Sequence, residues 1–278
     1  MHPLLRHSLF IASLEAAVQI FGLTYPGTRL DFPDPDVAFQ LGSALDFIVE
    51  QFADANVALI EFDEVHASPI IPGPTGIVEQ RLSRSARLRD MKARIRKECP
   101  HADFDEISFE AHRRIIQEHE AARQMPASLA SRRPHIHARS FVHAMEGIRK
   151  RLKTLAGQAD APATVRAEFD RFELAFPRLK HGRDSEQHRD ERERGKASER
   201  GRERQIIPHP IVNDEISAPV GGFVIGALKG RRYTITGPDG ALAEIEVSAA
   251  SMTRAQEILQ SILDAFPWRG PKRFHPGF

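Results

Sequence analysis

Residues 134–156, PHIHARSFVHAMEGIRKRLKTLA, carry the clearest fold signal in this sequence. Their apolar residues recur every three or four positions and form one continuous stripe: Ala138, Phe141, Val142, Met145, Ile148, Leu152 and Leu155. With 3.6 residues per turn, this spacing places all seven on one side of an α-helix and most charged residues on the other. The stretch therefore predicts an amphipathic helix that packs into a helical core.

Similar periodicity predicts further helices on both sides of this stretch. They cover residues 3–21, 37–55, 77–99, 104–124, 161–180 and 251–266. We expect Asp36 to cap the helix over residues 37–55, and Asp103 or Asp105 to cap the helix over residues 104–124. Pro100 should end the helix over residues 77–99, and Pro177 should interrupt the helix over residues 161–180. In the helix over residues 161–180 the inward residues are predicted to be Val165, Phe169, Phe172 and Leu174.

The pattern changes towards the C-terminus, where short segments rich in β-formers replace the helical spacing. GGFVIGALKG, RRYTITG and LAEIEVS follow one another between residues 221 and 248, separated by Lys229-Gly230 and by Pro238-Asp239-Gly240. This arrangement predicts a β-meander at about residues 219–248. Residues 56–67 also read as a strand. Residues 24–36 read as a turn-rich loop, and the tail 267–278 as irregular.

The predicted fold class is mainly α: a helical bundle with a small C-terminal antiparallel β-sheet and a final helix. We divide the chain into an N-terminal helical region of unknown role (1–100), a bundle that carries the meander (101–266) and an irregular tail (267–278). The length of 278 residues fits one large domain or two small ones.

Charge and cysteine content exclude several classes of function. The net charge is +1, from 39 basic and 38 acidic residues, so binding to nucleic acid or to an anionic membrane would have to be local. The single cysteine, Cys99, excludes an intrachain disulfide and a cysteine-cluster zinc site. Long uncharged apolar stretches and glycine-rich phosphate loops are absent from the sequence. We therefore expect a cytoplasmic protein with no membrane partner, no cofactor and no metal.

The charged run RDSEQHRDERERGKASERGRER, residues 183–204, holds the candidate catalytic residues Arg183, Asp184 and His188. On a helix, Arg183 and His188 would lie about one and a half turns apart. A histidine there can take a proton from an RNA 2′-hydroxyl, and an arginine can stabilise the charge that develops on the phosphate. The competing interpretation is a solvated linker, which is typical of charge runs.

Spacing alone does not select this pair. Five Arg/His pairs have four residues between them: Arg96/His101, Arg114/His119, Arg132/His137, Arg183/His188 and Arg204/His209. Two features distinguish Arg183/His188. It is the only pair with a small carboxylate, Asp184, directly after the arginine, and it follows a helix with an apolar face. We expect residues 183–191 to form the last turns of a bundle helix and residues 192–204 to form a solvated connector.

RLKHGRDSEQHRDERERGKASERG, after a phenylalanine-rich helix, resembles the final motif of the HEPN superfamily of helical-bundle domains. HARSFVHAMEGIRKRLKTLA is also similar to an upstream bundle helix in HEPN-like proteins of bacterial genomes. The resemblance covers about residues 105–200. It implies that Arg183 and His188 form the active pair and that Asp184 is the adjoining polar residue. The family's usual residue after the arginine is Asn, whereas the Asp here would repel a phosphate.

Three functional hypotheses follow. The first is a non-catalytic HEPN-like module of a bacterial cytoplasmic system, which forms a homodimer or binds an RNA or protein partner. The second is a metal-independent endoribonuclease of the defence or toxin type that uses Arg183, His188 and Asp184. The third is an unrelated enzyme centred on His135, His137 and His143, whose clustering in HIHARSFVH is the other local concentration of reactive side chains.

Overall fold

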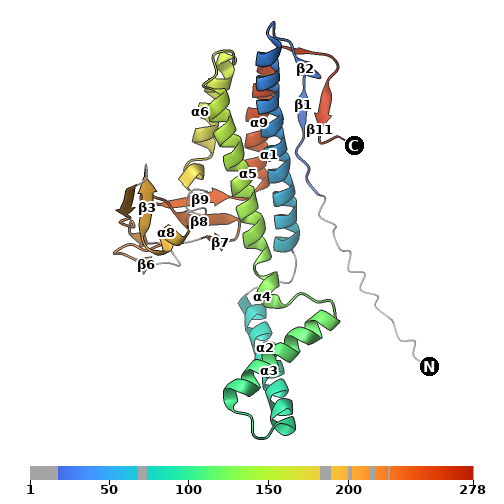
Figure 1. The fold of residues 1–278 in the computed structure, drawn as a ribbon, viewed down its shortest axis with the longest axis vertical. Coiled ribbons are helices and arrows are strands. Elements are labelled where there is room, and N and C mark those ends of the chain that lie inside the picture. Colours follow the sequence, from blue (N-terminus) through green and yellow to red (C-terminus); the bar gives the residue numbers. More distant parts are fainter. Residues whose placement is uncertain are drawn as a thin grey trace, which may run out of the picture.

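The computed structural model describes residues 18–67, 74–181, 189–199, 202–212, 217–224 and 226–277. The protein is mainly helical, with small antiparallel sheets and a final helix, in agreement with the predicted class (Figure 1). The helices are α1 (Pro35–Ala67), α2 (Pro74–Glu98), α3 (Phe104–Ala121), α4 (Ala127–Ala130), α5 (Arg133–Leu155), α6 (Ala163–Ala175), α8 (Arg189–Glu193) and α9 (Ala249–Ala265).

The main core lies inside a four-helix bundle. Helix α1 packs against α5, α5 against α6, α6 against α9, and α9 against α1. All seven apolar residues of the predicted α5 stripe are completely buried there, which confirms the prediction. The prediction for Leu174 was wrong: its side chain is 84% exposed. It follows the buried Phe172 by two residues, or about 200° around the helix, and so faces away from the core.

Residues 56–67, predicted as a strand, are the last turns of α1. Leu59 and Phe62 are three residues apart and both are buried against the bundle core. A short apolar run fits either a strand or a buried helix, and here the run continues the periodicity of the preceding helix. Asp34, and not Asp36, caps α1, because its Oδ1 accepts a hydrogen bond from the backbone amide of Asp36 at 2.8 Å.

The two ends of the chain pair with each other, contrary to prediction. Strand β1 (Leu23–Tyr25) pairs antiparallel with β11 (Arg273–His275), and β2 (Arg29–Leu30) pairs with β10 (Trp268–Arg269). The tail is therefore not irregular and residues 24–36 are not only a loop. Of the predicted helix 3–21, residues 1–17 lie outside the described residues and 18–21 are not helical. Strands of two or three residues leave no periodicity that sequence reading could detect.

The predicted β-meander is present. Strands β7 (Ala227–Lys229), β8 (Arg232–Thr236) and β9 (Leu242–Glu246) form an antiparallel sheet in that order. Part of the predicted solvated connector is also ordered, because β3 (Lys196–Glu199) pairs with β4 (Arg202–Gln205). A two-stranded sheet, β5 (Ile211–Val212) with β6 (Ser217–Ala218), lies between this hairpin and the meander in the sequence.

Helices α2 and α3 form a hairpin that extends from one end of the bundle (Figure 1). Its buried apolar cluster is separate from the main core and contains Met91, Ile95, Ile107 and Ala111. Pro100 lies in the turn that ends α2, as predicted, and Asp103 caps α3 in a complete capping box with Glu106. The domain boundary proposed at residue 100 therefore falls inside this hairpin, and the main core takes side chains from both sides of it.

Candidate functional site

The predicted catalytic residues Arg183, Asp184 and His188 lie outside the described residues. The described chain ends at His181 on one side of them and resumes with α8 on the other. The prediction that residues 183–191 form the last turns of a bundle helix is thus testable only from Arg189 onwards, where α8 is helical. The side chains directly before this segment form the first candidate site.

Arg178, His181 and Asp239 form a polar cluster where the chain leaves α6. Both terminal guanidinium nitrogens of Arg178 donate to the Asp239 carboxylate, Nη2 to Oδ2 at 2.9 Å and Nη1 to Oδ1 at 3.3 Å. The ring atom Nδ1 of His181 lies 3.9 Å from Asp239 Oδ2 and makes no hydrogen bond within the described residues. The cluster therefore holds an imidazole beside a carboxylate that a guanidinium already neutralises.

Local backbone structure brings these groups together. Pro177 follows the end of α6, and Arg178 then adopts a left-handed φ of 65°, which turns the chain towards the meander. Asp239 belongs to the predicted turn between β8 and β9, where its Oδ1 also accepts the backbone amide of Ala241 at 3.2 Å. Gly240 in the same turn has a φ of +84°. The contact therefore joins the exit of α6 to the tip of the sheet.

Electrostatics keep the Asp239 carboxyl ionised. Partial burial alone would raise its pKa, but the Arg178 and Ala241 hydrogen bonds, together with the nearby charge of Arg178, hold the pKa below its usual range. An ionised carboxylate beside a histidine can orient the imidazole ring. Because Arg178 is held bidentately by Asp239, its guanidinium is not available to a phosphate in this arrangement.

Sequence reasoning missed this cluster. It recognised Asp239 only as a turn residue and did not single out Arg178 or His181. The two ends of the Arg178–Asp239 pair are 61 residues apart, and only tertiary packing brings them within hydrogen-bonding distance. The available signal was Pro177 followed by three basic residues, Arg178, Lys180 and His181, which marks a break after α6 but does not indicate a partner.

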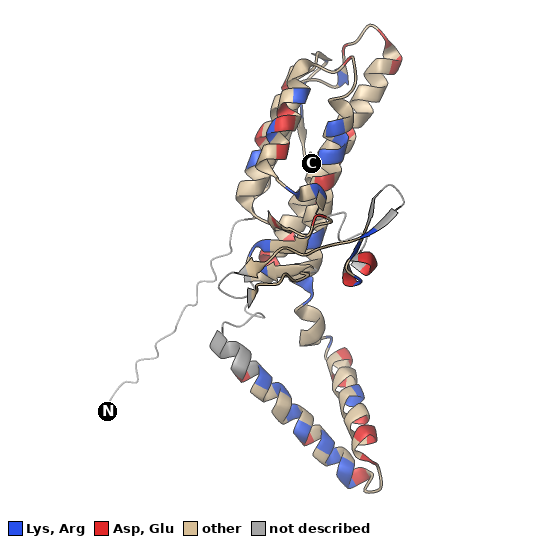
Figure 2. Cartoon of the chain, turned by 90° about the vertical axis from the view of Figure 1, so that its left-hand side faces the viewer, with Lys and Arg blue, Asp and Glu red and all other residues tan. Residues whose placement is uncertain are grey.

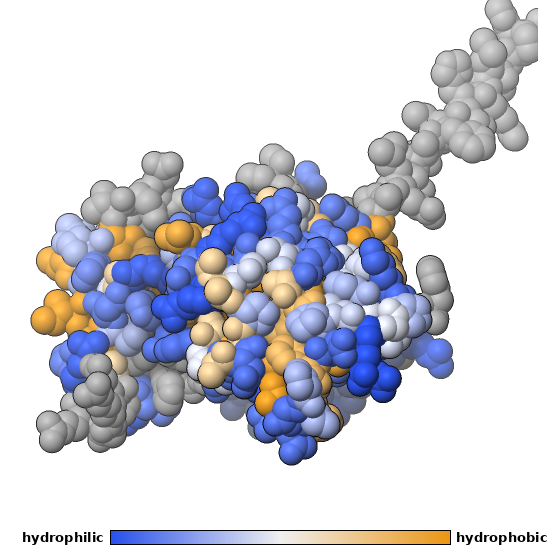
Figure 3. Space-filling view, turned by 90° about the horizontal axis from the view of Figure 1, so that it is seen from above, coloured by the Kyte–Doolittle hydropathy of each residue, from blue (hydrophilic) through white to orange (hydrophobic). Residues whose placement is uncertain are grey.

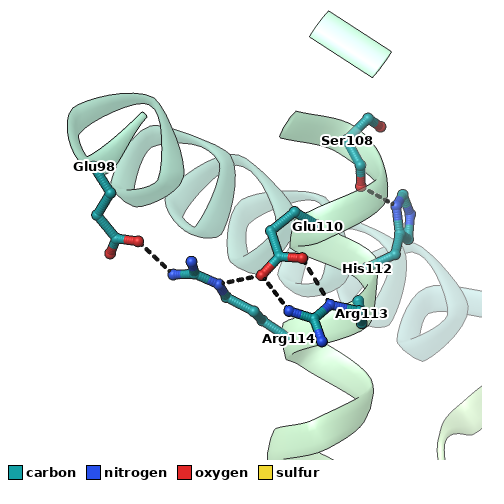
Figure 4. A network of polar contacts seen from close by, with 6 residues as sticks. All are labelled: Glu98, Ser108, Glu110, His112, Arg113 and Arg114. Atoms are coloured by element: carbon teal, nitrogen blue, oxygen red, sulfur yellow. Dashed lines mark hydrogen bonds and ion pairs between the residues drawn. The ribbon is translucent and has the colours of Figure 1, made fainter. Parts of the chain in front are cut away.

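The second candidate site is the α2–α3 hairpin, whose two helices are linked by ion pairs. Glu110 on α3 accepts hydrogen bonds from Arg113 and Arg114, and Arg114 also reaches Glu98 at the end of α2 at 2.6 Å (Figure 4). Nearer the bundle, Arg87 of α2 lies 2.7 Å from Glu118 of α3. The Arg114–Glu98 and Arg87–Glu118 contacts join the two helices, although the hairpin buries few apolar residues.

The outer face of α3 exposes two large apolar side chains. Phe109 is 71% exposed and Ile116, two turns later on the same side, is 42% exposed. The buried residues Ile107 and Ala111 lie on the opposite side of this helix and face α2. The end of the bundle that lies away from the hairpin shows a mostly hydrophilic surface with several hydrophobic areas between polar residues (Figure 3).

An open groove of about 660 Å³ between α6 and α9 is a weaker candidate. Two of its lining residues, Gln256 and Gln260, already serve the fold. Gln256 donates to the Gly22 carbonyl at 2.6 Å, and Gln260 bonds both the backbone amide and the carbonyl of Thr24. Their amides hold β1 against α9. Glu257, Ser261 and Asp264, which also line the groove, bond other side chains of the protein, so few of its polar groups are available to a ligand.

Metal binding and membrane insertion find no support in the described part of the chain. Within it, no three His, Cys, Asp or Glu residues are grouped so that they could bind a metal ion. This search includes His135, His137 and His143, the basis of the third hypothesis. None of the helices in the described ranges combines the length and apolar character needed to cross a membrane.

Comparisons with protein-family models, with curated proteins and with solved structures find no significant match to this chain.

Proposed function

We propose that this chain is a non-catalytic, HEPN-like helical module that pairs with a second copy of itself through the α2–α3 hairpin. The observation that carries the proposal is the exposed pair Phe109 and Ile116 on the outer face of α3. Large apolar side chains at positions i and i+7 form a helical stripe of the kind that packs against another helix. The four-helix bundle and the motif after α6 support the resemblance to HEPN domains.

The size of the hairpin core favours a partner. Four buried residues hold α2 to α3, while Phe109 and Ile116 remain 71% and 42% exposed on the outer face of α3. A helical pair this small gains little from its own burial, and covering exposed apolar area contributes about 25 cal/mol per Å². A second copy supplies an identical stripe, and a two-fold interface buries each stripe against the other.

Sedimentation velocity and light scattering of the full chain test the pairing. We expect a dimer in the wild type and a monomer in Phe109→Ser/Ile116→Ser. The matched control is Leu174→Ser, which removes an 84% exposed leucine from α6, outside the hairpin. The control should remain dimeric.

Two results would contradict the pairing. One is a wild-type protein that stays monomeric over the whole concentration series. The other is a dimer that survives in Phe109→Ser/Ile116→Ser with an unchanged dissociation constant. Circular dichroism of each variant verifies that the helical content is preserved, which is expected because both substituted side chains are exposed.

The alternative function is metal-independent cleavage of RNA by Arg183 and His188, with Asp184 beside them. One observation favours it: the Arg178–Asp239 contact fixes the described chain shortly before that segment, and His181 adds an imidazole next to an ionised carboxylate. In this alternative His181 and His188 would share acid and base roles, and Arg183 would stabilise the phosphate in the transition state.

RNA degradation by the purified protein in EDTA tests the alternative. Activity that is lost in His188→Ala and in Arg183→Ala, with circular dichroism unchanged, would support it and displace the non-catalytic proposal. Equal RNA degradation by the wild type and His188→Ala would point to a contaminating nuclease and would exclude the alternative.

A further inference from the structure

Helix α2 is strongly basic in a chain whose net charge is only +1. Its 25 residues include eight Arg or Lys and three Asp or Glu. Figure 2 shows these basic residues along nearly the whole length of the helix, which extends away from the bundle as one arm of the hairpin. The local positive charge that a polyanion would need is therefore present on one exposed element.

The positive charge has a preferred side. Positions 81, 89, 92 and 96 are separated by eight, three and four residues, so Arg81, Arg89, Lys92 and Arg96 fall within about 80° of arc on an ideal helix. They extend over about 22 Å of helix axis at 1.5 Å per residue. The acidic residues Glu79, Asp90 and Glu98 fall outside this arc. We call these four cations the basic face of α2.

The basic face is not neutralised by the protein within the described ranges. There, Arg81, Arg89 and Arg96 are exposed and have no carboxylate within ion-pair distance. This contrasts with Arg113 and Arg114 on α3, which both bond Glu110. Like charges three or four residues apart destabilise a helix by about 0.2–0.5 kcal/mol per pair. A bound polyanion would remove this repulsion.

An aromatic ring lies beside these cations. The Nζ of Lys92 lies 4.6 Å from the ring centroid of Phe104, the first residue of α3, and the Phe104 side chain is 64% exposed. Cations that contact phosphates, with an exposed aromatic ring among them, are the elements with which proteins hold single-stranded nucleic acid. A membrane surface or an acidic peptide would use the charges but would not need a ring for base stacking.

We propose that the basic face of α2, with Phe104, binds the phosphate backbone of single-stranded nucleic acid and stacks one of its bases. This inference does not rest on the proposed dimer, because pairing uses Phe109 and Ile116 on the outer face of α3. It also does not rest on RNA cleavage, because none of its residues belongs to the segment that contains Arg183 and His188.

Fluorescence anisotropy with the full chain tests the proposal. The probes are labelled single-stranded DNA and RNA of the same sequence, the matching duplexes, and vesicles containing anionic lipid. The test variant is Arg81→Ala/Arg89→Ala/Arg96→Ala. The control is Lys150→Ala/Lys153→Ala/Lys272→Ala, which removes the same charge from exposed positions on α5 and in the tail.

We expect the wild type to bind single strands, and the test variant to lose at least about tenfold in affinity. The slope of log affinity against log salt concentration should also become shallower by about two. The variant removes three arginines, and each phosphate contact contributes about 0.7 to this slope for single strands. The control should stay within about twofold of the wild type. Comparing DNA with RNA shows which backbone is preferred. Phe104→Ala should weaken binding to single strands more than to duplexes.

Several outcomes would overturn the proposal. They are a test variant that binds as tightly as the wild type, a control that loses affinity equally, and tighter binding to vesicles than to nucleic acid. Tighter binding to duplexes, or no loss in Phe104→Ala, would overturn the assignment to single strands. Binding that persists in the monomeric variant Phe109→Ser/Ile116→Ser would separate this surface from the dimer, so each proposal can fail alone.

Discussion

Arg149 and Glu146, one turn apart on α5, form a buried ion pair inside the helical bundle. Nε and Nη2 of Arg149 donate to the Glu146 carboxylate, and Nη1 donates to the Glu173 carboxylate of α6 at 2.6 Å. Arg149 is 8% and Glu146 3% exposed. Burial would lower the pKa of Arg149, but its bonds to Glu146 and Glu173 raise the pKa above the ordinary value. Arg149 therefore stays charged in the core and links α5 to α6.

Removing Arg149 should destabilise the fold strongly. Arg149→Leu leaves the Glu146 carboxylate buried without a partner, which typically costs about 3–5 kcal/mol. Glu173→Gln should cost much less, because the Glu173 side chain is 43% exposed and its charge can be hydrated. Urea denaturation monitored by circular dichroism measures both free energies of unfolding. A loss for Arg149→Leu no larger than that for Glu173→Gln would contradict a structural role for the pair.

The hairpin should respond to acid through Glu110. Hydrogen bonds from Arg113 and Arg114 lower the pKa of Glu110 from 4.5 to about 2. Since the pKa in the folded state lies below that in the unfolded state, this stabilisation is present above pH 4.5 and is lost as the pH falls towards 2. NMR titration of the Glu110 carboxyl carbon measures the pKa directly. In Arg113→Gln/Arg114→Gln the pKa should return towards 4.5, and an unchanged value would refute the role of the arginines.

Two glycines with similar backbone angles should differ in their tolerance of alanine. Gly240 has a φ of +84°, and a Cβ there would lie 2.0 Å from the Ile207 carbonyl oxygen. Gly230 has a φ of +53° and an open environment. Gly230→Ala should cost about 1 kcal/mol from the left-handed backbone alone, whereas Gly240→Ala should cost more because backbone atoms must also move. Thermal unfolding of the two variants provides the comparison, and equal melting temperatures would be inconsistent with the close approach.

Trp268 should anchor the paired chain ends. Its ring meets that of Tyr25 edge to face at a centroid distance of 5.5 Å, and its Nε1 donates to the Leu263 carbonyl at 2.7 Å. Trp268→Ala should cost about 2–4 kcal/mol, from lost packing and the lost side-chain hydrogen bond. Trp268→Phe should recover most of the packing but not the hydrogen bond. Circular dichroism melts test the order, and a Trp268→Ala variant as stable as the wild type would show that the strands hold without it.

Helices with long apolar stripes were predictable because their evidence is local. The α5 stripe and the Asp103 cap are both fixed by residues within a few turns of each other. The helical structure of residues 56–67 was not predictable in this way. A run of apolar residues is compatible with a strand or with a buried helix until the packing partner, α5, is known. The candidate catalytic residues Arg183, Asp184 and His188 stay a prediction from the motif, since they lie outside the described residues.

The sequence by itself determined the mainly helical class, the α5 stripe, the meander with its Pro238-Asp239-Gly240 turn, and the basic character of α2. Each depends on periodicity or composition within one segment. Only the tertiary structure decided that the chain ends pair as strands, that Arg178 meets Asp239, and that α2 and α3 leave the bundle as a hairpin. Those features depend on contacts between distant segments, for which local sequence carries no signal.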